Sequence, residues 1–71
     1  MPSATAREFQ EVARRLGFSK TRQTGSHEGW NHPDGRAVTI PLHGGQEIGP
    51  PPFFKILPQL GISLEAFQKI R

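Results

Sequence analysis

Cysteine and tyrosine are absent from the 71-residue chain, and tryptophan and methionine occur once each. Without cysteine there is no disulfide and no thiolate ligand for a metal. This absence fits a reducing compartment, so we expect a cytoplasmic protein. No apolar run approaches the roughly 20 residues needed to span a bilayer. The first residues, MPSATAREF, show no charged segment followed by an apolar one, so neither a membrane span nor a signal peptide is expected.

Acidic residues are also scarce. Six Asp and Glu stand against nine Lys and Arg, which gives a net charge of +3 and a sequence pI near 10.2. A basic balance favours anionic partners such as nucleic acid, although many small domains carry a similar excess. A chain of this length buries only about 60% of the surface that its unfolded form exposes. We therefore expect a single domain over residues 1–71 with a thin core.

Helical spacing of apolar residues appears twice, at i, i+3, i+4 and i+7. Thr5 and Glu8 form a capping box before the first stripe, and Gly17 follows it as a helix terminator. Gly61 ends the second stripe, and Ser63 caps a short last helix. The two stripes are Phe9, Val12, Ala13 and Leu16, and Phe53, Ile56, Leu57 and Leu60; the last helix carries Leu64, Phe67 and Ile70.

Three strands are expected between the helices, over residues 18–24, 27–32 and 36–41. Gly25-Ser26 is a two-residue turn of type II′, and Pro33-Asp34-Gly35 is a three-residue turn. Residues 42–52 are expected to form a loop. The resulting α-β-β-β-α-α order predicts an α+β fold, with a three-stranded antiparallel sheet and the helices on one face.

Turn geometry determines which residues lie opposite each other and therefore which face each side chain joins. The first turn sets the pairs Lys20 with Asn31, Arg22 with Gly29 and Thr24 with His27. The second turn sets the pairs Trp30 with Val38 and Glu28 with Ile40. Apolar residues should face the helices, so Trp30 is expected in the core rather than stacked on a nucleobase. The other face is expected to be open and basic, with Lys20, Arg22, Thr24, His27, Asn31, Ala37 and Thr39.

His27 has two interpretations at this point. A histidine titrates near pH ~6.5, so both of its forms are available at neutral pH. Beside Lys20 and Arg22, it could take a proton from an RNA 2′-hydroxyl or donate one to the departing 5′-oxygen. Alternatively, it is a surface residue of a hairpin with no chemical role. If the face binds RNA, the candidate contacts are Lys20, Arg22, Thr24, Ser26 and Asn31.

Other chemistries have weaker support. His27 and His32 differ in strand parity, His43 lies in a glycine-rich loop, and no carboxylate falls at a zinc-like spacing, so we expect no metal site. Ser26 is interpreted as a turn residue rather than a nucleophile, because no acid partner is placed beside it. No motif for a small-molecule cofactor is present.

Several motifs in order, "LGF", "GSH", "HPDGR", "VTIPLHGG" and "GIS", resemble the HicA toxins of prokaryotic toxin–antitoxin systems over about residues 5 to 70. The resemblance implies a double-stranded-RNA-binding-like fold and a metal-independent ribonuclease that cleaves mRNA. It also implies a HicB antitoxin that covers the active face, and it assigns the catalytic role to the histidine of the GSH motif, His27.

The second helix departs from the pattern of that family. Pro51 and Pro52 replace a Gly-Thr pair, and Phe53 replaces a leucine. Each proline removes an N–H that a phosphate at the helix N-terminus would use. Pro58 lies within the helical stripe, where proline costs about 3 kcal/mol.

Three functions fit the sequence. The first is a toxin endoribonuclease that uses His27, and the second is a non-catalytic RNA-binding module of the same fold. The third is an interaction domain whose basic face binds an acidic protein.

Overall fold

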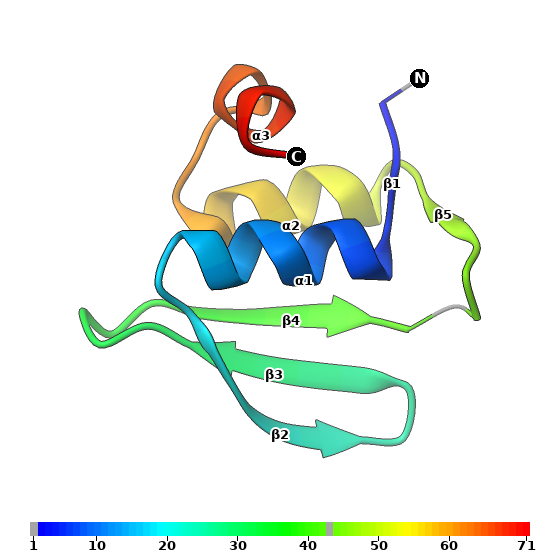
Figure 1. Ribbon diagram of the computed structural model, residues 1–71. Coiled ribbons are helices and arrows are strands. Elements are labelled where there is room, and N and C mark those ends of the chain that lie inside the picture. Colours follow the sequence, from blue (N-terminus) through cyan, green and yellow to red (C-terminus); the bar gives the residue numbers. More distant parts are fainter. Residues whose placement is uncertain (1, 43) are drawn as a thin grey trace.

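A three-stranded antiparallel sheet with helices on one face forms the body of the molecule (Figure 1). The structure is a computed structural model that describes residues 2–42 and 44–71. The elements in chain order are β1 (Ala4–Thr5), α1 (Ala6–Arg15), β2 (Ser19–Thr24), β3 (His27–Asn31), β4 (Ala37–Pro41), β5 (Glu47–Ile48), α2 (Pro52–Leu60) and α3 (Leu64–Ile70). The predicted α+β class and the order of the long elements are confirmed. The architecture is that of a double-stranded-RNA-binding-like fold.

The segment 42–52 differs from the predicted loop. Within it, β5 pairs antiparallel with β1, which brings Ile48 opposite Ala4 and Glu47 opposite Thr5. Both Ala4 and Ile48 are buried, so this short ladder closes one end of the core. Two residues per strand are too few to show an alternating pattern in the sequence, and this explains why the pair was missed. The predicted loop residue His43 lies outside the described residues.

The helix boundaries follow local chemistry. Thr5 and Glu8 form the predicted capping box: the Thr5 N–H donates to Glu8 Oε1 at 3.0 Å, and the Glu8 N–H donates to Thr5 Oγ1 at 3.2 Å. Gly17 follows α1 with φ of 99°, and Gly61 ends α2 with φ of 78°, a conformation that side chains with a Cβ rarely adopt. Ser63 accepts the Ala66 N–H at 3.1 Å and caps α3.

Pro58 lies inside α2, and its position explains why it is tolerated. Proline removes the N–H that would reach the carbonyl of Phe54, four residues earlier. Phe54 and Pro58 are both exposed, so this part of α2 lies on the side of the helix that faces solvent. A helix carbonyl without a partner costs less there, because water can reach that side.

Three phenylalanines form the centre of the core, one from each helix. The ring centroids of Phe9 and Phe53 are 5.4 Å apart, those of Phe9 and Phe67 5.0 Å, and those of Phe53 and Phe67 5.5 Å. All three side chains are fully buried. Most of the remaining buried apolar residues come from the two predicted stripes and from the inner face of the sheet, including Trp30, Val38 and Ile40. Ala4, Phe18 and Ile48 complete the core.

Both predicted turns are confirmed. Thr24 lies opposite His27 across Gly25-Ser26, and positive φ at Gly25 with negative φ at Ser26 fits the type II′ geometry. The His32 N–H donates to the Arg36 carbonyl at 2.9 Å, which closes the three-residue turn. The pairs Trp30 with Val38 and Glu28 with Ile40 are those predicted. His27 therefore lies on the face away from the helices.

The predicted position of Lys20 is wrong. The register shifts between Lys20 and Arg22, so that Lys20 lies opposite Trp30 and Ser19 lies opposite Asn31. The extra residue, Thr21, forms a β-bulge, and one additional residue reverses the parity of every earlier side chain in the strand. Lys20 consequently lies on the helix side of the sheet, away from His27.

Candidate functional site

The face of the sheet that no helix covers carries His27 and is called the open face below. Its residues come from all three long strands. They are Thr21, Arg22, Thr24, His27, Gly29, Asn31, Ala37, Thr39 and Pro41. His27 is exposed, and within the described residues its ring makes no hydrogen bond. Both ring nitrogens are therefore available to a ligand.

Arg22 lies across the centre of the open face. A Cβ atom added to Gly29 would lie 3.0 Å from Arg22 Cγ and 3.1 Å from Arg22 Nε, so glycine at this position lets the arginine lie flat on the sheet. In the described part of the chain Arg22 forms no ion pair. Gly29 is two residues from His27 along β3, a separation of about 6.5 Å. A free guanidinium is thus held within reach of a phosphate that contacts His27.

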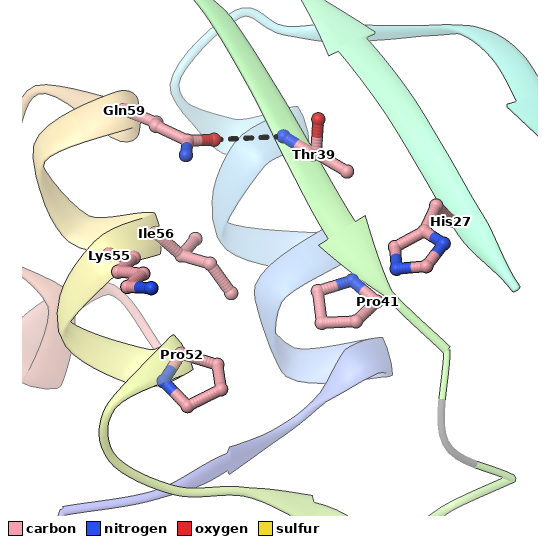
Figure 2. Close-up of a pocket in the computed structure, with 7 residues that line it drawn as sticks. All are labelled: His27, Thr39, Pro41, Pro52, Lys55, Ile56 and Gln59. Carbon is pink, nitrogen blue, oxygen red and sulfur yellow. Dashed lines mark hydrogen bonds between the residues drawn. The ribbon is translucent and has the colours of Figure 1, made fainter.

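A pocket at the edge of the open face lies between β4 and α2 (Figure 2). Its volume is about 370 Å³. Apolar surfaces come from Pro41, Pro52 and Ile56. The polar groups that line it are His27, Thr39, Lys55 and Gln59. Lys55 takes part in no ion pair among residues 2–42 and 44–71, so the pocket that His27 lines also contains a second available cation.

A side-chain hydrogen bond joins helix α2 to the outer edge of β4. Gln59 Oε1 accepts the Thr39 N–H at 2.9 Å. The backbone N–H and C=O groups of alternate residues in β4 point toward β3. Those of Thr39 and Pro41 point away from β3, toward the outer edge of the sheet. Proline has no N–H, and Gln59 satisfies that of Thr39, so this edge offers few free donors for another strand.

Sequence reasoning missed Lys55 and Gln59. Both lie on the polar side of the α2 stripe, four residues apart, and this spacing places them on one helical surface. The spacing alone could have shown that the two side chains lie next to each other on the surface of the helix. The strand that they face depends on how α2 packs against the sheet, which no local pattern specifies.

Lys20 pairs with a buried carboxylate instead of contributing to the open face. Its Nζ lies 3.4 Å from Glu28 Oε2. Glu28 Oε1 also accepts from Gln10 Nε2 at 2.7 Å and from Trp30 Nε1 at 3.1 Å. Burial raises the pKa of Glu28, but the hydrogen bonds from Gln10, Trp30 and Lys20 outweigh it and hold the pKa below its ordinary value of 4.5. Glu28 points away from His27 and cannot act as its proton partner.

Acid should weaken the fold through Glu28. A carboxyl whose pKa is lower in the folded than in the unfolded chain stabilises the fold above the unfolded value, and this contribution is lost as the pH falls through the folded value. We expect Glu28→Gln to lower stability at neutral pH and to flatten the loss of stability below pH ~4.5. Urea unfolding, followed by Trp30 fluorescence at pH values from about 7 to about 3, measures the free energy of unfolding of both proteins. If the stability of Glu28→Gln fell in acid as steeply as that of the wild type, the prediction would be wrong.

The other predicted contact residues are spread over the open face. Thr24 lies directly opposite His27, and Ser26 is in the adjoining turn, where its carbonyl accepts the Leu42 N–H at 2.6 Å. Asn31 is at the far end of β3, and its Oδ1 accepts from Thr21 Oγ1 at 2.6 Å. Thr24 and Ser26 are thus near His27, and Asn31 is not.

His32 has a structural role. Its Nε2 lies 3.1 Å from the Leu16 carbonyl at the end of α1, and its Nδ1 accepts the Asp34 N–H at 3.0 Å. The ring packs edge-on against Phe18, with centroids 5.1 Å apart. Both nitrogens are occupied, so His32 is not available as a ligand. No cluster of three potential metal ligands occurs in the described ranges, and no helix there is long and apolar enough to cross a membrane.

Comparison with known proteins identifies the family. No curated protein matches the chain. Residues 6–62 match the family described as "HicA toxin of bacterial toxin-antitoxin", a match that includes the whole sheet, α1 and α2. Because toxins of such systems are paired with an antitoxin, an antitoxin partner follows from the family. The chain therefore belongs to the HicA toxin family of bacterial toxin–antitoxin systems.

Proposed function

We propose that this toxin is an endoribonuclease that cleaves mRNA without a metal ion, with His27 as the general acid or base. The observation that carries the proposal is the exposed ring of His27, which shares the open face with Arg22 and lines the same pocket as Lys55. This arrangement suits an anionic substrate with a transferable proton. RNA offers both in its phosphate and its 2′-hydroxyl.

The reaction uses the nucleophile that RNA itself provides. The 2′-oxygen attacks the adjacent phosphorus, the P–O5′ bond breaks, and a 2′,3′-cyclic phosphate and a 5′-hydroxyl result. His27 takes the proton of the 2′-hydroxyl or supplies one to the leaving 5′-oxygen, a contribution of about 10²–10⁴ in rate. Arg22 and Lys55 stabilise the extra negative charge of the pentacovalent phosphorane.

Incubation of the purified protein with RNA in excess EDTA tests this mechanism. We expect cleavage to continue, the products to end in a 2′,3′-cyclic phosphate or its hydrolysis product, and DNA of the same sequence to stay intact. Activity that EDTA abolishes, or a product with a 3′-hydroxyl, would overturn the mechanism. Binding of RNA without any cleavage would favour a non-catalytic RNA-binding module.

The salt dependence of RNA binding should locate the cations that contact phosphate. Each phosphate contact to a single strand adds about 0.7 to the slope of log K against log salt. Arg22→Gln and Lys55→Gln should each reduce the slope by about that amount or less. Lys20→Gln is the matched control, because Lys20 lies on the other face beside Glu28. Fluorescence anisotropy over a salt series measures the slopes, and an equal reduction in all three variants would place the contacts elsewhere.

We further propose that the antitoxin partner is of the HicB type and covers the open face. The free cations of that face favour an acidic surface on the partner. Covering His27 would exclude RNA from it, so co-expression of the antitoxin should abolish growth arrest by the toxin.

A further inference from the structure

The pocket between β4 and α2 has the surfaces that a planar base needs. Pro41, Pro52 and Ile56 line it with rigid, apolar groups, and His27 lies at one side (Figure 2). Small-molecule sites of this kind combine apolar walls with a few polar groups that fix orientation. Because His27 lines the same pocket, a nucleotide whose base enters here would bring its phosphate near His27.

Gln59 presents its side-chain NH₂ group at this pocket as a hydrogen-bond donor. Its Oε1 accepts the Thr39 N–H at 2.9 Å, and a flipped amide would place its NH₂ against that N–H. The contact therefore determines the orientation of the amide. Nε2 has no partner within the part of the chain that the structure describes. Figure 2 shows it on the side of the hydrogen bond where Ile56 and Lys55 lie.

A side-chain amide with both groups free pairs with adenine through a donor and an acceptor. Here Oε1 already accepts the Thr39 N–H, whereas the NH₂ group has no partner within the described residues and lies on the side of Ile56 and Lys55. We therefore expect the amide to act in the pocket as a donor. At the base edge that carries O4 of uracil or O6 of guanine, such a group donates to the carbonyl oxygen. Cytosine and adenine carry an exocyclic amine at the same position, and its N–H cannot accept that donor.

We propose that this pocket binds the base next to the cleaved bond and that Gln59 selects uracil or guanine there. The inference rests on the proposed function for the identity of the ligand as RNA. Gln59 is a specificity-determining residue in this scheme, and Thr39 positions it through its backbone N–H.

Binding of non-cleavable oligonucleotides tests the selection apart from catalysis. Hexamers of 2′-O-methyl uridine and 2′-O-methyl cytidine have the same phosphates and lack the 2′-hydroxyl nucleophile. We expect wild type to bind the uridine hexamer roughly two- to tenfold more tightly, the worth of one hydrogen bond. Gln59→Glu keeps an oxygen for the Thr39 N–H and replaces the donor with an acceptor, so the ratio should fall to one or below.

Gln68→Glu is the matched control for the added negative charge. Gln68 lies on α3 and accepts from Arg71 Nη1 at 3.3 Å, away from the pocket. This variant should bind both hexamers less tightly and keep the wild-type ratio. A wild-type ratio of one, or an unchanged ratio in Gln59→Glu, would overturn the proposal.

A measurement on the wild-type protein covers the case in which Gln59→Glu fails to fold. The side-chain amide signals of Gln59 should shift in NMR spectra on addition of the uridine hexamer and less so with the cytidine hexamer. Equal shifts would overturn the selection. Neither hexamer can be cleaved, so the binding results do not depend on whether His27 is catalytic. Cleavage in EDTA, in turn, does not depend on which base the pocket selects. The two proposals can therefore fail separately.

Discussion

Replacing His27 with alanine is expected to slow RNA cleavage by roughly 10² or more, the usual contribution of a general acid or base. The ring is exposed and has no hydrogen bond within the described residues, so its removal should change stability by less than about 0.5 kcal/mol. His27→Gln keeps a polar group of similar size but cannot transfer a proton at neutral pH, so it should be equally impaired. Cleavage rates with a labelled RNA, and growth arrest on expression, measure the loss.

Gln23→Ala is the control for this experiment. Gln23 belongs to the same hairpin and lies opposite Glu28, on the helix side of the sheet. Truncation there should leave cleavage near the wild-type rate. If His27→Ala retained activity within about threefold of the wild type, the acid–base role would be untenable. Equal losses in both variants would instead indicate damage to the hairpin.

The largest stability effect is expected at the centre of the aromatic core. Phe53→Ala removes a fully buried ring that contacts those of Phe9 and Phe67. Such truncations cost about 3–5 kcal/mol. The total free energy of unfolding of a chain of this length is roughly 4–10 kcal/mol. We expect a fall in Tm of more than about 10 °C, measured by circular dichroism.

Phe54→Ala is the adjacent control, because its side chain is 46% exposed. Its ring contacts one face of the core, at 5.2 Å from the Phe53 centroid. Its loss should cost about 1 kcal/mol or less. Equal destabilisation by the two substitutions would mean that α2 is rotated relative to the arrangement described above.

Features that depend on neighbouring residues were predictable from the sequence. The Thr5 and Glu8 capping box, the glycine after each long helix and the apolar stripes all involve residues within about four positions of each other. The same holds for the Gly25-Ser26 and Pro33-Asp34-Gly35 turns. Because turn geometry sets the register, it was enough to place His27 on the open face and Trp30 in the core.

Features that depend on distant segments were decided by the tertiary structure. The bulge at Thr21 moved Lys20 to the helix side, where it pairs with Glu28, and no turn signal marks an extra residue in mid-strand. The β1–β5 pair and the packing of α2 on β4 likewise join residues far apart in the chain. The sequence by itself determined the three helices, the three long strands and the face that carries His27. The sequence also placed Arg22 on that face, but only packing brought Lys55 and Gln59 to the site, because both reach it across the edge of β4.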